Sequence, residues 1–374
     1  MAYDAQRVNH LDGLRGIAAV TVVVFHYLSA FVPALTPDQT ANPYWLSDTP
    51  LAVLFNGPFA VVVFFVLSGF VVSKAAYRND PLPLTIGLRY LRLTIPMLAS
   101  VLVAWLLLTE FPTDASKLAA ITGTPWLTRT FNGQIPSLFQ AIKDATLDAY
   151  LNGQSRFNNA LWSMQWELIG SLTIYVVFAL FPRPVIVKVW IAFFVLLLLG
   201  RSPFFYEAFV LGILMQEAWT RSRLKPVAPE LALVIGLILG SQSAGFAKRH
   251  GLDFLPGGLQ PGNPVGLIYP IAAALVVYGC LMSVPVAKFL QQTGCLFLGR
   301  ISFGLYLIHV PIAYTVVMAV AVLLWPMSAI TLGLGLPIFI ALSIGLGWLI
   351  TVLVDAPTLR LLSSIRKFAV PSAA

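Results

Sequence analysis

Long apolar runs follow one another along most of the chain. Eight of them approach the roughly 20 helical residues needed to cross a hydrocarbon core of about 30 Å. They cover residues 14–33, 58–76, 93–110, 161–181, 229–246, 265–285, 300–324 and 332–354. Two shorter runs, 186–200 and 203–219, lie close together. We therefore predict an all-α, polytopic membrane helix bundle with about ten transmembrane helices, or eight if the short pair forms a re-entrant hairpin.

Composition and charge support the same interpretation. Of the 374 residues, 58% are hydrophobic and 10% are charged, whereas a soluble domain carries about 25% charged residues. This composition excludes a soluble enzyme. The net charge of +8 would suggest a nucleic-acid partner in a soluble protein, but in a membrane protein Lys and Arg accumulate in cytoplasmic loops. We therefore expect this chain to lie in the lipid bilayer and to bind no nucleic acid.

The distribution of Lys and Arg predicts the orientation. If the N-terminus lies inside, 16 of these residues fall at cytoplasmic span ends and seven fall outside. Four of the seven lie in the single long segment 111–160. By the positive-inside rule, both termini are predicted to be cytoplasmic. Cys280 and Cys295 then fall near the cytoplasmic face, where a disulfide is not expected.

The segment 111–160 is the only sizeable stretch outside the predicted spans, and we place it on the extracytoplasmic side. Apolar residues recur in it at helical spacing between charged ones, which is typical of a helix lying on a membrane surface. The apolar positions are Ile135, Leu138, Phe139, Ile142 and Tyr150, and the charged ones are Lys143, Asp144 and Asp148. A lid over an outward-facing site is the alternative. We expect residues 1–374 to form one integral-membrane domain with no fused soluble domain.

Polar groups inside predicted spans indicate where function resides, because an ionisable side chain in hydrocarbon is costly. On the first span, His26 follows Arg15 by 11 residues, which is a rise of about 16 Å and a return to within about 20° of the same face. His26 is thus predicted near the bilayer midplane, above an arginine at the cytoplasmic mouth.

Three further spans carry comparable groups. Ser68 lies on the second, Glu167 on the fourth and His309 on the ninth. Each of these residues alone could simply hold helices together. The small pair Ser68 and Gly69 could allow either a neighbouring helix or a ligand to come close. Because four spans place such groups at similar depth, we predict one shared functional site.

Arg89 and Arg92 lie three residues apart at the cytoplasmic start of the third span. They anchor the span by the positive-inside rule, or they form a phosphate clamp, since guanidinium groups bind phosphate in bidentate fashion. A neutral histidine in an apolar site is a suitable general base for a hydroxyl group. Together these features favour acyl transfer from a cytoplasmic, nucleotide-bearing thioester to an alcohol from the other side, without a metal.

Five motifs in order resemble the acyltransferase 3 family of integral-membrane O-acyltransferases, over roughly residues 10–357. They are Leu11–Gly16 with Phe25-His26, the run Phe64–Phe70, the Arg89/Arg92 pair, Leu161–Ser163 with Glu167, and Gly299–Ser302 with Tyr306–His309. Two positions depart from the family pattern: Leu168 stands where a second acidic residue is common, and Asp355-Ala356-Pro357 replaces Glu-x-Pro.

The resemblance implies ten spans and transfer of an acetyl or related acyl group from cytoplasmic acyl-CoA to an extracytoplasmic carbohydrate or cell-surface glycan. It implies that Arg15 and His26 are essential and that Arg89 and Arg92 lie on the donor side. We take Arg15, Arg89 and Arg92 as donor-binding candidates. The catalytic candidates are His26, Ser68, Glu167 and His309. The expected location is the bacterial inner membrane.

Two other functions remain possible at this point. An acyl exporter that feeds a separate transferase would use the same donor chemistry, and sequence does not separate it from a complete enzyme. A proton-coupled secondary transporter also places His and Glu at the midplane. It predicts inverted repeats and broken helices in matching halves, and the sequence shows neither.

Overall fold

The computed structural model describes most of the chain. Its continuous ranges are 8–36, 44–78, 80–110, 135–181, 184–199, 203–243, 268–324 and 326–370, with residues 112, 115–124, 126, 246, 250–251 and 266 between them. Within these ranges the regular structure is helical, without a strand. The all-α prediction is therefore confirmed for the part of the chain that the structure describes.

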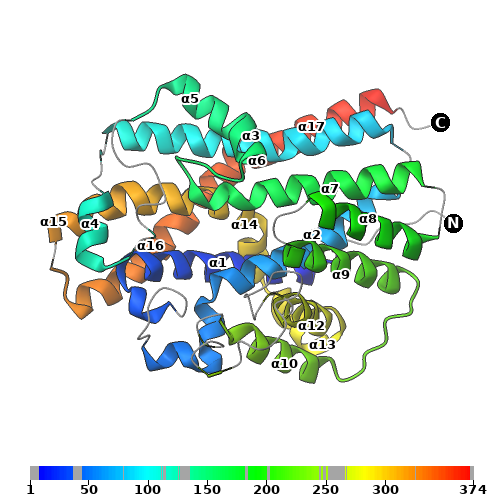
Figure 1. Ribbon diagram of the computed structural model, residues 1–374, viewed down its shortest axis with the longest axis horizontal. Coiled ribbons are helices and arrows are strands. Elements are labelled where there is room, and N and C mark those ends of the chain that lie inside the picture. The colour runs from blue at the N-terminus through cyan, green and yellow to red at the C-terminus, as the bar shows by residue number, and fades with distance from the viewer. Residues whose placement is uncertain are drawn as a thin grey trace.

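Most of the helices run along one axis and form a bundle (Figure 1). In chain order, the helices that line its first half are α1 (Asn9–Phe31), α2 (Gly57–Ala76), α3 (Leu82–Glu110), α4 (Ala115–Thr122), α5 (Leu138–Lys143), α6 (Ala149–Leu151), α7 (Trp162–Leu180) and α8 (Val185–Leu199). The second half contains α9 (Pro203–Thr220), α10 (Pro229–Ser241), α12 (Ile268–Met282), α13 (Val284–Leu290), α14 (Thr293–Ile312), α15 (Met318–Leu324), α16 (Ala329–Ile350) and α17 (Ala356–Ala369). Helix α1 begins and α17 ends toward the same end of the bundle, on the right in Figure 1. We call this the basic end, because Arg15, Arg89, Arg92 and Arg300 lie toward it.

The number of membrane spans differs from the sequence prediction. Among the described residues, six helices are long and apolar enough to cross a membrane, or seven if α12 and α13, which meet at a 91° bend, form one span. Helix α10 has 13 residues, which extend only about 20 Å. The predicted count of about ten is not confirmed. The runs 186–200 and 203–219 form two separate helices, α8 and α9, and the cytoplasmic placement of the termini stays a prediction.

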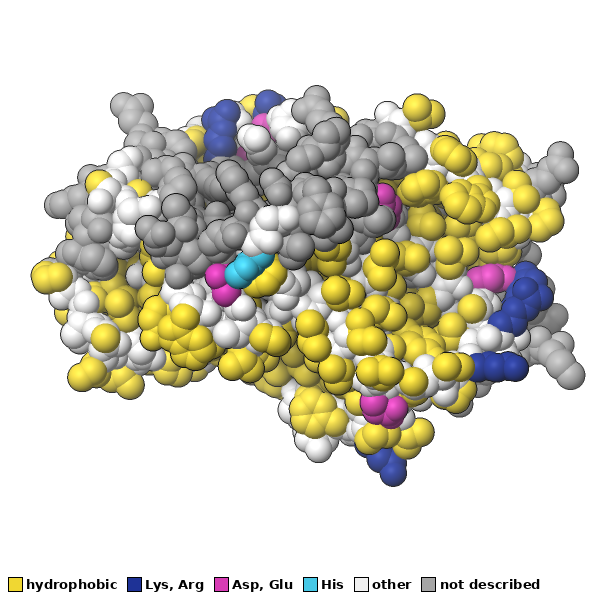
Figure 2. Space-filling view, turned by 60° about the horizontal axis from the view of Figure 1, so that its bottom comes forward, with side chains coloured by type: hydrophobic (Ala, Val, Ile, Leu, Met, Phe, Trp, Pro, Cys, Tyr) yellow, Lys and Arg dark blue, Asp and Glu magenta, His cyan; other side chains and the backbone are white. Residues whose placement is uncertain are grey.

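The outer surface of the bundle is apolar, as expected of a protein in lipid. Figure 2 shows one face on which hydrophobic side chains cover the middle while Lys and Arg lie at the margins. Exposed apolar residues of α10 and α12 contribute to the surface of the protein, among them Leu231, Val234, Ile238 and Ile271. Such a surface is stable only in an apolar solvent. The chain is therefore an integral membrane protein.

Glycines bring α1 and α14 into close contact at the basic end. A Cβ added at Gly299 would overlap the carbonyl oxygen of Asp12, and one added at Gly16 would overlap the backbone at Gly299. Gly13 meets the carbonyl of Leu290 in the same way. Small residues allow two helix backbones to approach in a membrane. Arg15 directly precedes Gly16, and Arg300 directly follows Gly299. The contact between the two glycines therefore fixes the position of Arg15 relative to Arg300.

A methyl group at this contact should therefore destabilise the bundle. We expect Gly299→Ala to lower the free energy of unfolding by about 1–3 kcal/mol, the usual cost of overpacking, as measured by thermal unfolding in detergent. Gly294→Ala is the matched control, because it lies on the same helix with no atom within 4 Å of the added Cβ. Equal midpoints for the two variants would contradict the close contact.

The segment between α3 and α7 enters the bundle. Helix α5 and the π-helical turn Asp144–Asp148 pack against α3, and α6, which follows the turn, packs against α7. The Tyr150 hydroxyl contacts Thr94 at 2.9 Å, and Tyr90 donates to the Thr146 carbonyl at 2.9 Å. Asp144 and Tyr150 are buried, whereas Phe139 is 74% exposed. A helix thus exists where the periodicity predicts one, but its charged Asp144 faces the protein and not water.

Candidate functional site

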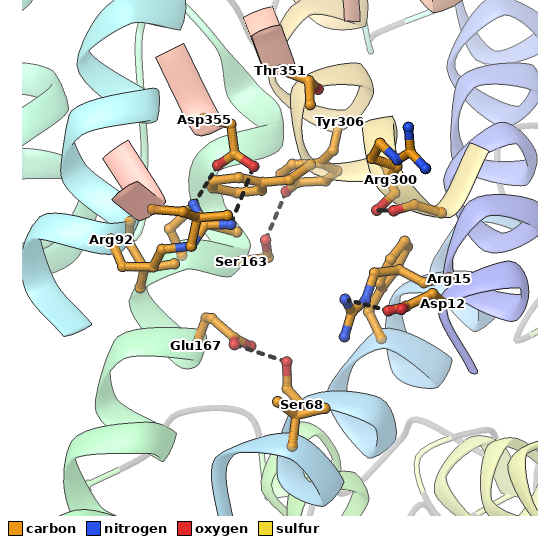
Figure 3. Close-up of a pocket in the computed structure, with 18 of the residues that line it drawn as sticks. Asp12, Arg15, Ser68, Arg92, Ser163, Glu167, Arg300, Tyr306, Thr351 and Asp355 are labelled. Atoms are coloured by element: carbon orange, nitrogen blue, oxygen red, sulfur yellow. Dashed lines mark hydrogen bonds and ion pairs between the residues drawn. The ribbon is translucent and has the colours of Figure 1, made fainter. Parts of the chain in front are cut away.

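A pocket of about 610 Å³ lies between α1, α2, α3, α7, α14 and the junction of α16 with α17. Figure 3 shows its polar side chains. The charged and polar residues that line it are Asp12, Arg15, Ser68, Arg89, Arg92, Ser163, Glu167, Arg300, Ser302, Tyr306, Thr351 and Asp355. Four of them are arginines, so the pocket is suited to a ligand that carries negative charge.

One wall of the pocket holds a hydrogen-bonded cluster around Glu167. Its carboxylate accepts hydrogen bonds from the Ser68 hydroxyl at 2.8 Å and from Arg89. Arg89 also donates through Nε to the Ser171 hydroxyl at 2.9 Å. The side chains of Arg89 and Glu167 are only 17% and 14% exposed, so each neutralises a charge that would be costly alone.

A second ion pair joins α3 to the end of α16. Arg92 donates to both carboxylate oxygens of Asp355, to Oδ2 at 3.4 Å, and its guanidinium carbon lies 5.0 Å from the centre of the Phe303 ring. Asp355 ends the π-helical turn Thr351–Asp355 that connects α16 with α17. The sequence indicates Asp355 only as a departure from Glu-x-Pro, and gives no sign of its partner.

The opposite side of the pocket carries Arg15 and Arg300, which Figure 3 shows near each other and across from Arg92. Arg15 lies 3.5 Å from Asp12, one helical turn earlier on α1. Arg300 is exposed. Sequence reasoning placed Arg300 among the cytoplasmic charges but not among the site candidates.

The two histidines that the sequence predicts near the bilayer midplane contact each other. Nδ1 of His26 lies 2.7 Å from Nε2 of His309, and the two rings are nearly coplanar, with an interplanar angle of 19°. His309 Nδ1 lies 3.1 Å from the Leu305 carbonyl. His26 is 8% exposed and His309 is completely buried. The sequence predicts both histidines within one shared site, and the structure brings these two side chains together.

The hydrogen bonds define the tautomers. A carbonyl can only accept, so Nδ1 of His309 carries a proton, and in the neutral ring Nε2 then carries a lone pair. Nδ1 of His26 must donate to that lone pair. His26 Nε2 is consequently unprotonated when the ring is neutral. This is the arrangement of a general base whose ring is oriented by a second group.

An aromatic residue of the long segment 111–160, Trp126, covers His26. The Trp126 ring lies 5.0 Å from the His26 ring at 25°. Trp126 is held by the Tyr314 hydroxyl, which donates to its carbonyl at 2.6 Å, and by Thr124. Sequence reasoning missed Trp126, because no periodicity indicates which residue of an irregular segment turns inward.

The pocket and the histidine pair are separated by one layer of side chains. The Tyr306 hydroxyl lies 2.7 Å from the Ser163 hydroxyl and also donates to the Ala160 carbonyl. Ser163 and Tyr306 line the pocket, and His309 follows Tyr306 by three residues, a rise of about 4.5 Å. We call this layer the Ser163–Tyr306 partition.

The seven candidate residues therefore form two groups and not one shared cluster. His26 and His309 lie beyond the partition, whereas Ser68, Glu167, Arg15, Arg89 and Arg92 line the pocket. Glu167 does not join the histidines, at whose depth the sequence predicts it: it pairs with Arg89, only seven residues from the start of α3.

Gly69 does not face the pocket. A Cβ added there would overlap the carbonyl of Phe209 on α9, so its small size serves packing of α2 against α9. Cys280 and Cys295 are both free thiols. Among the described residues, no group of three or more His, Cys, Asp or Glu is placed to hold a metal ion.

Comparison with known proteins agrees with this arrangement. An acyltransferase domain, that of the acyltransferase 3 family, matches residues 8–352. The chain therefore belongs to this family of membrane acyltransferases. Neither a curated protein nor a solved structure matches it.

Proposed function

We propose that the protein is an O-acyltransferase that moves an acetyl or related acyl group from acyl-CoA at the basic end to a hydroxyl group of a carbohydrate on the other side of the membrane. The observation that carries this proposal is the arginine-lined pocket that ends one helical turn from a hydrogen-bonded histidine pair. A single path then joins a site for an anionic donor to a general base.

The dimensions suit such a donor. The rise from Arg15 to His26 is about 16 Å, which is comparable to an extended pantetheine arm. The nucleotide would stay among the arginines, and the thioester would reach the Ser163–Tyr306 partition. Opening of the Ser163–Tyr306 hydrogen bond would then admit the carbonyl to His26. Glu167 and Ser68 hold Arg89 at the pocket wall, which makes them part of the donor side.

In the chemical step, the acceptor hydroxyl gives its proton to Nε2 of His26 as its oxygen attacks the thioester carbonyl. The tetrahedral intermediate collapses, the carbon–sulfur bond breaks, and the proton passes from His26 to the departing sulfur. The products are the O-acyl ester and free CoA. His309 positions the His26 ring and stabilises its cationic form through the Nδ1–Nε2 hydrogen bond.

Sealed vesicles of known orientation test the proposal. We expect CoA release when acyl-CoA is supplied at the basic end and a carbohydrate acceptor at the opposite side, and none when the two sides are exchanged. Acyl transfer that continues with exchanged sides would contradict the path. CoA release without any acceptor would favour an acyl exporter that serves a separate transferase.

A further inference from the structure

The charges around the pocket do not balance. Four arginines line it, Arg15, Arg89, Arg92 and Arg300, against the three carboxylates Asp12, Glu167 and Asp355. Each carboxylate forms an ion pair with one of the first three arginines. The remaining positive charge belongs to Arg300, for which the described part of the chain offers no ion pair.

The paired arginines of α3 are already engaged. Arg89 is bound to Glu167 and Ser171, and Arg92 to Asp355 and the Phe303 ring. If either bound a phosphate instead, its carboxylate would lose its partner in a largely buried position. That exchange is costly, because a buried charge without a partner is strongly destabilising. A ligand phosphate therefore gains little by competing for Arg89 or Arg92.

Arg300 requires no such exchange. It is exposed and lines the pocket from α14, and Figure 3 shows it on the same side as Arg15. The contact of Gly299 with Asp12 and Gly16 fixes the backbone beneath both arginines. Arg15 forms an ion pair with Asp12 at 3.5 Å. Arg300 is thus the arginine of the pocket whose charge is least compensated among the described residues, and Arg15 lies beside it.

We propose that Arg300, together with Arg15, binds the phosphate groups of the acyl donor, while Arg89 and Arg92 hold the pocket wall in place through their carboxylates. This inference rests on the proposed function, whose donor is a nucleotide thioester. A guanidinium group provides several N–H donors in a planar fork that matches phosphate oxygens. Arg300 is therefore a donor-specificity residue, because only donors that carry phosphate interact with it.

The test compares CoA with pantetheine, which lacks the nucleotide. Binding of each is measured calorimetrically on the full-length purified protein in nanodiscs of neutral lipid. We expect wild type to bind CoA more tightly, and Arg300→Ala to weaken CoA binding by about 10- to 100-fold, which corresponds to lost charged hydrogen bonds. Pantetheine binding should not change. The CoA affinity of Arg300→Lys should lie between those of wild type and Arg300→Ala, because lysine keeps the positive charge but lacks the planar fork of N–H donors.

Arg223→Ala is the matched control, because Arg223 is also exposed but does not line the pocket. Thermal unfolding of Arg300→Ala should match wild type, since the substitution removes no ion pair. If wild type prefers CoA and Arg300→Ala keeps that preference, the phosphate site is overturned while the proposed function survives. If wild type binds neither compound, the proposed function itself fails, and the phosphate site with it.

Anionic lipid headgroups carry the same phosphate chemistry, so a second set of nanodiscs distinguishes the sources. With anionic lipid added, CoA binding to wild type should still exceed that of Arg300→Ala. If Arg300→Ala instead changes only the thermal stability gained from anionic lipid, and leaves CoA binding as in wild type, Arg300 binds lipid phosphate and the proposal is wrong.

Discussion

His26→Ala should insert and fold but lose acyl transfer by a factor of about 100 to 10,000, the usual range for a general acid–base group. The substitution removes Nε2, which takes the acceptor proton in the proposed step, and leaves the arginine-lined pocket intact. The measurement is the turnover of purified protein with acyl-CoA and acceptor, together with CoA binding. We expect CoA binding to remain, because His26 does not line the pocket.

The histidine pair supplies the control. His309→Ala should also lower turnover, because it removes the acceptor of the His26 Nδ1–H hydrogen bond. The double variant His26→Ala/His309→Ala should be no slower than His26→Ala alone, since groups that act as a unit have non-additive effects. Near-normal turnover in His26→Ala would remove His26 from the mechanism. Additive losses would mean that His309 acts separately.

The second large effect is expected at the Arg89–Glu167 pair. Arg89→Leu leaves the Glu167 carboxylate 14% exposed without its cation, which should lower the free energy of unfolding by on the order of 3 kcal/mol. Among the residues that the structure describes, the Ser68 hydroxyl would remain as a hydrogen-bond donor to this carboxylate. Thermal unfolding in detergent measures the loss.

A double-mutant cycle separates the pair from other effects of the substitution. Arg89→Leu/Glu167→Leu removes both charges, so we expect it to recover much of the stability lost in Arg89→Leu. Lys74→Leu serves as a control for the loss of one positive charge near the same end. If the double variant is no more stable than Arg89→Leu, the ion pair contributes nothing and the cost lies in packing.

Periodicity along a helix was enough to predict which polar side chains share a face. Arg15 and His26 share a face of α1, and His309 shares a face of α14 with Tyr306, because each set is separated by near-whole helical turns. Both faces carry polar groups in predicted membrane spans, which led to the prediction of a shared site. That the two histidines contact each other directly is a finding of the structure.

Position along the membrane normal could not be predicted in the same way. The sequence predicts Glu167 at a depth similar to that of the histidines, which assumes that the segment before α7 stays outside. That segment instead packs against α3, where Tyr150 contacts Thr94. Arg92 on α3 pairs with Asp355 at the end of the turn after α16, and Glu167 on α7 pairs with Arg89 on α3. The two members of each pair lie far apart in the sequence. Such pairings depend on tertiary packing, which spacing within one helix does not encode.

The Ser163–Tyr306 partition also bears on how the membrane stays sealed. A protein that brings polar groups to the bilayer centre risks conducting protons along a chain of water molecules. Here the two histidines lie between the partition and Trp126, and both are almost entirely buried. Protein side chains therefore pack on both sides of the histidine pair. A bundle packed in this way would limit the leakage of protons past the histidines.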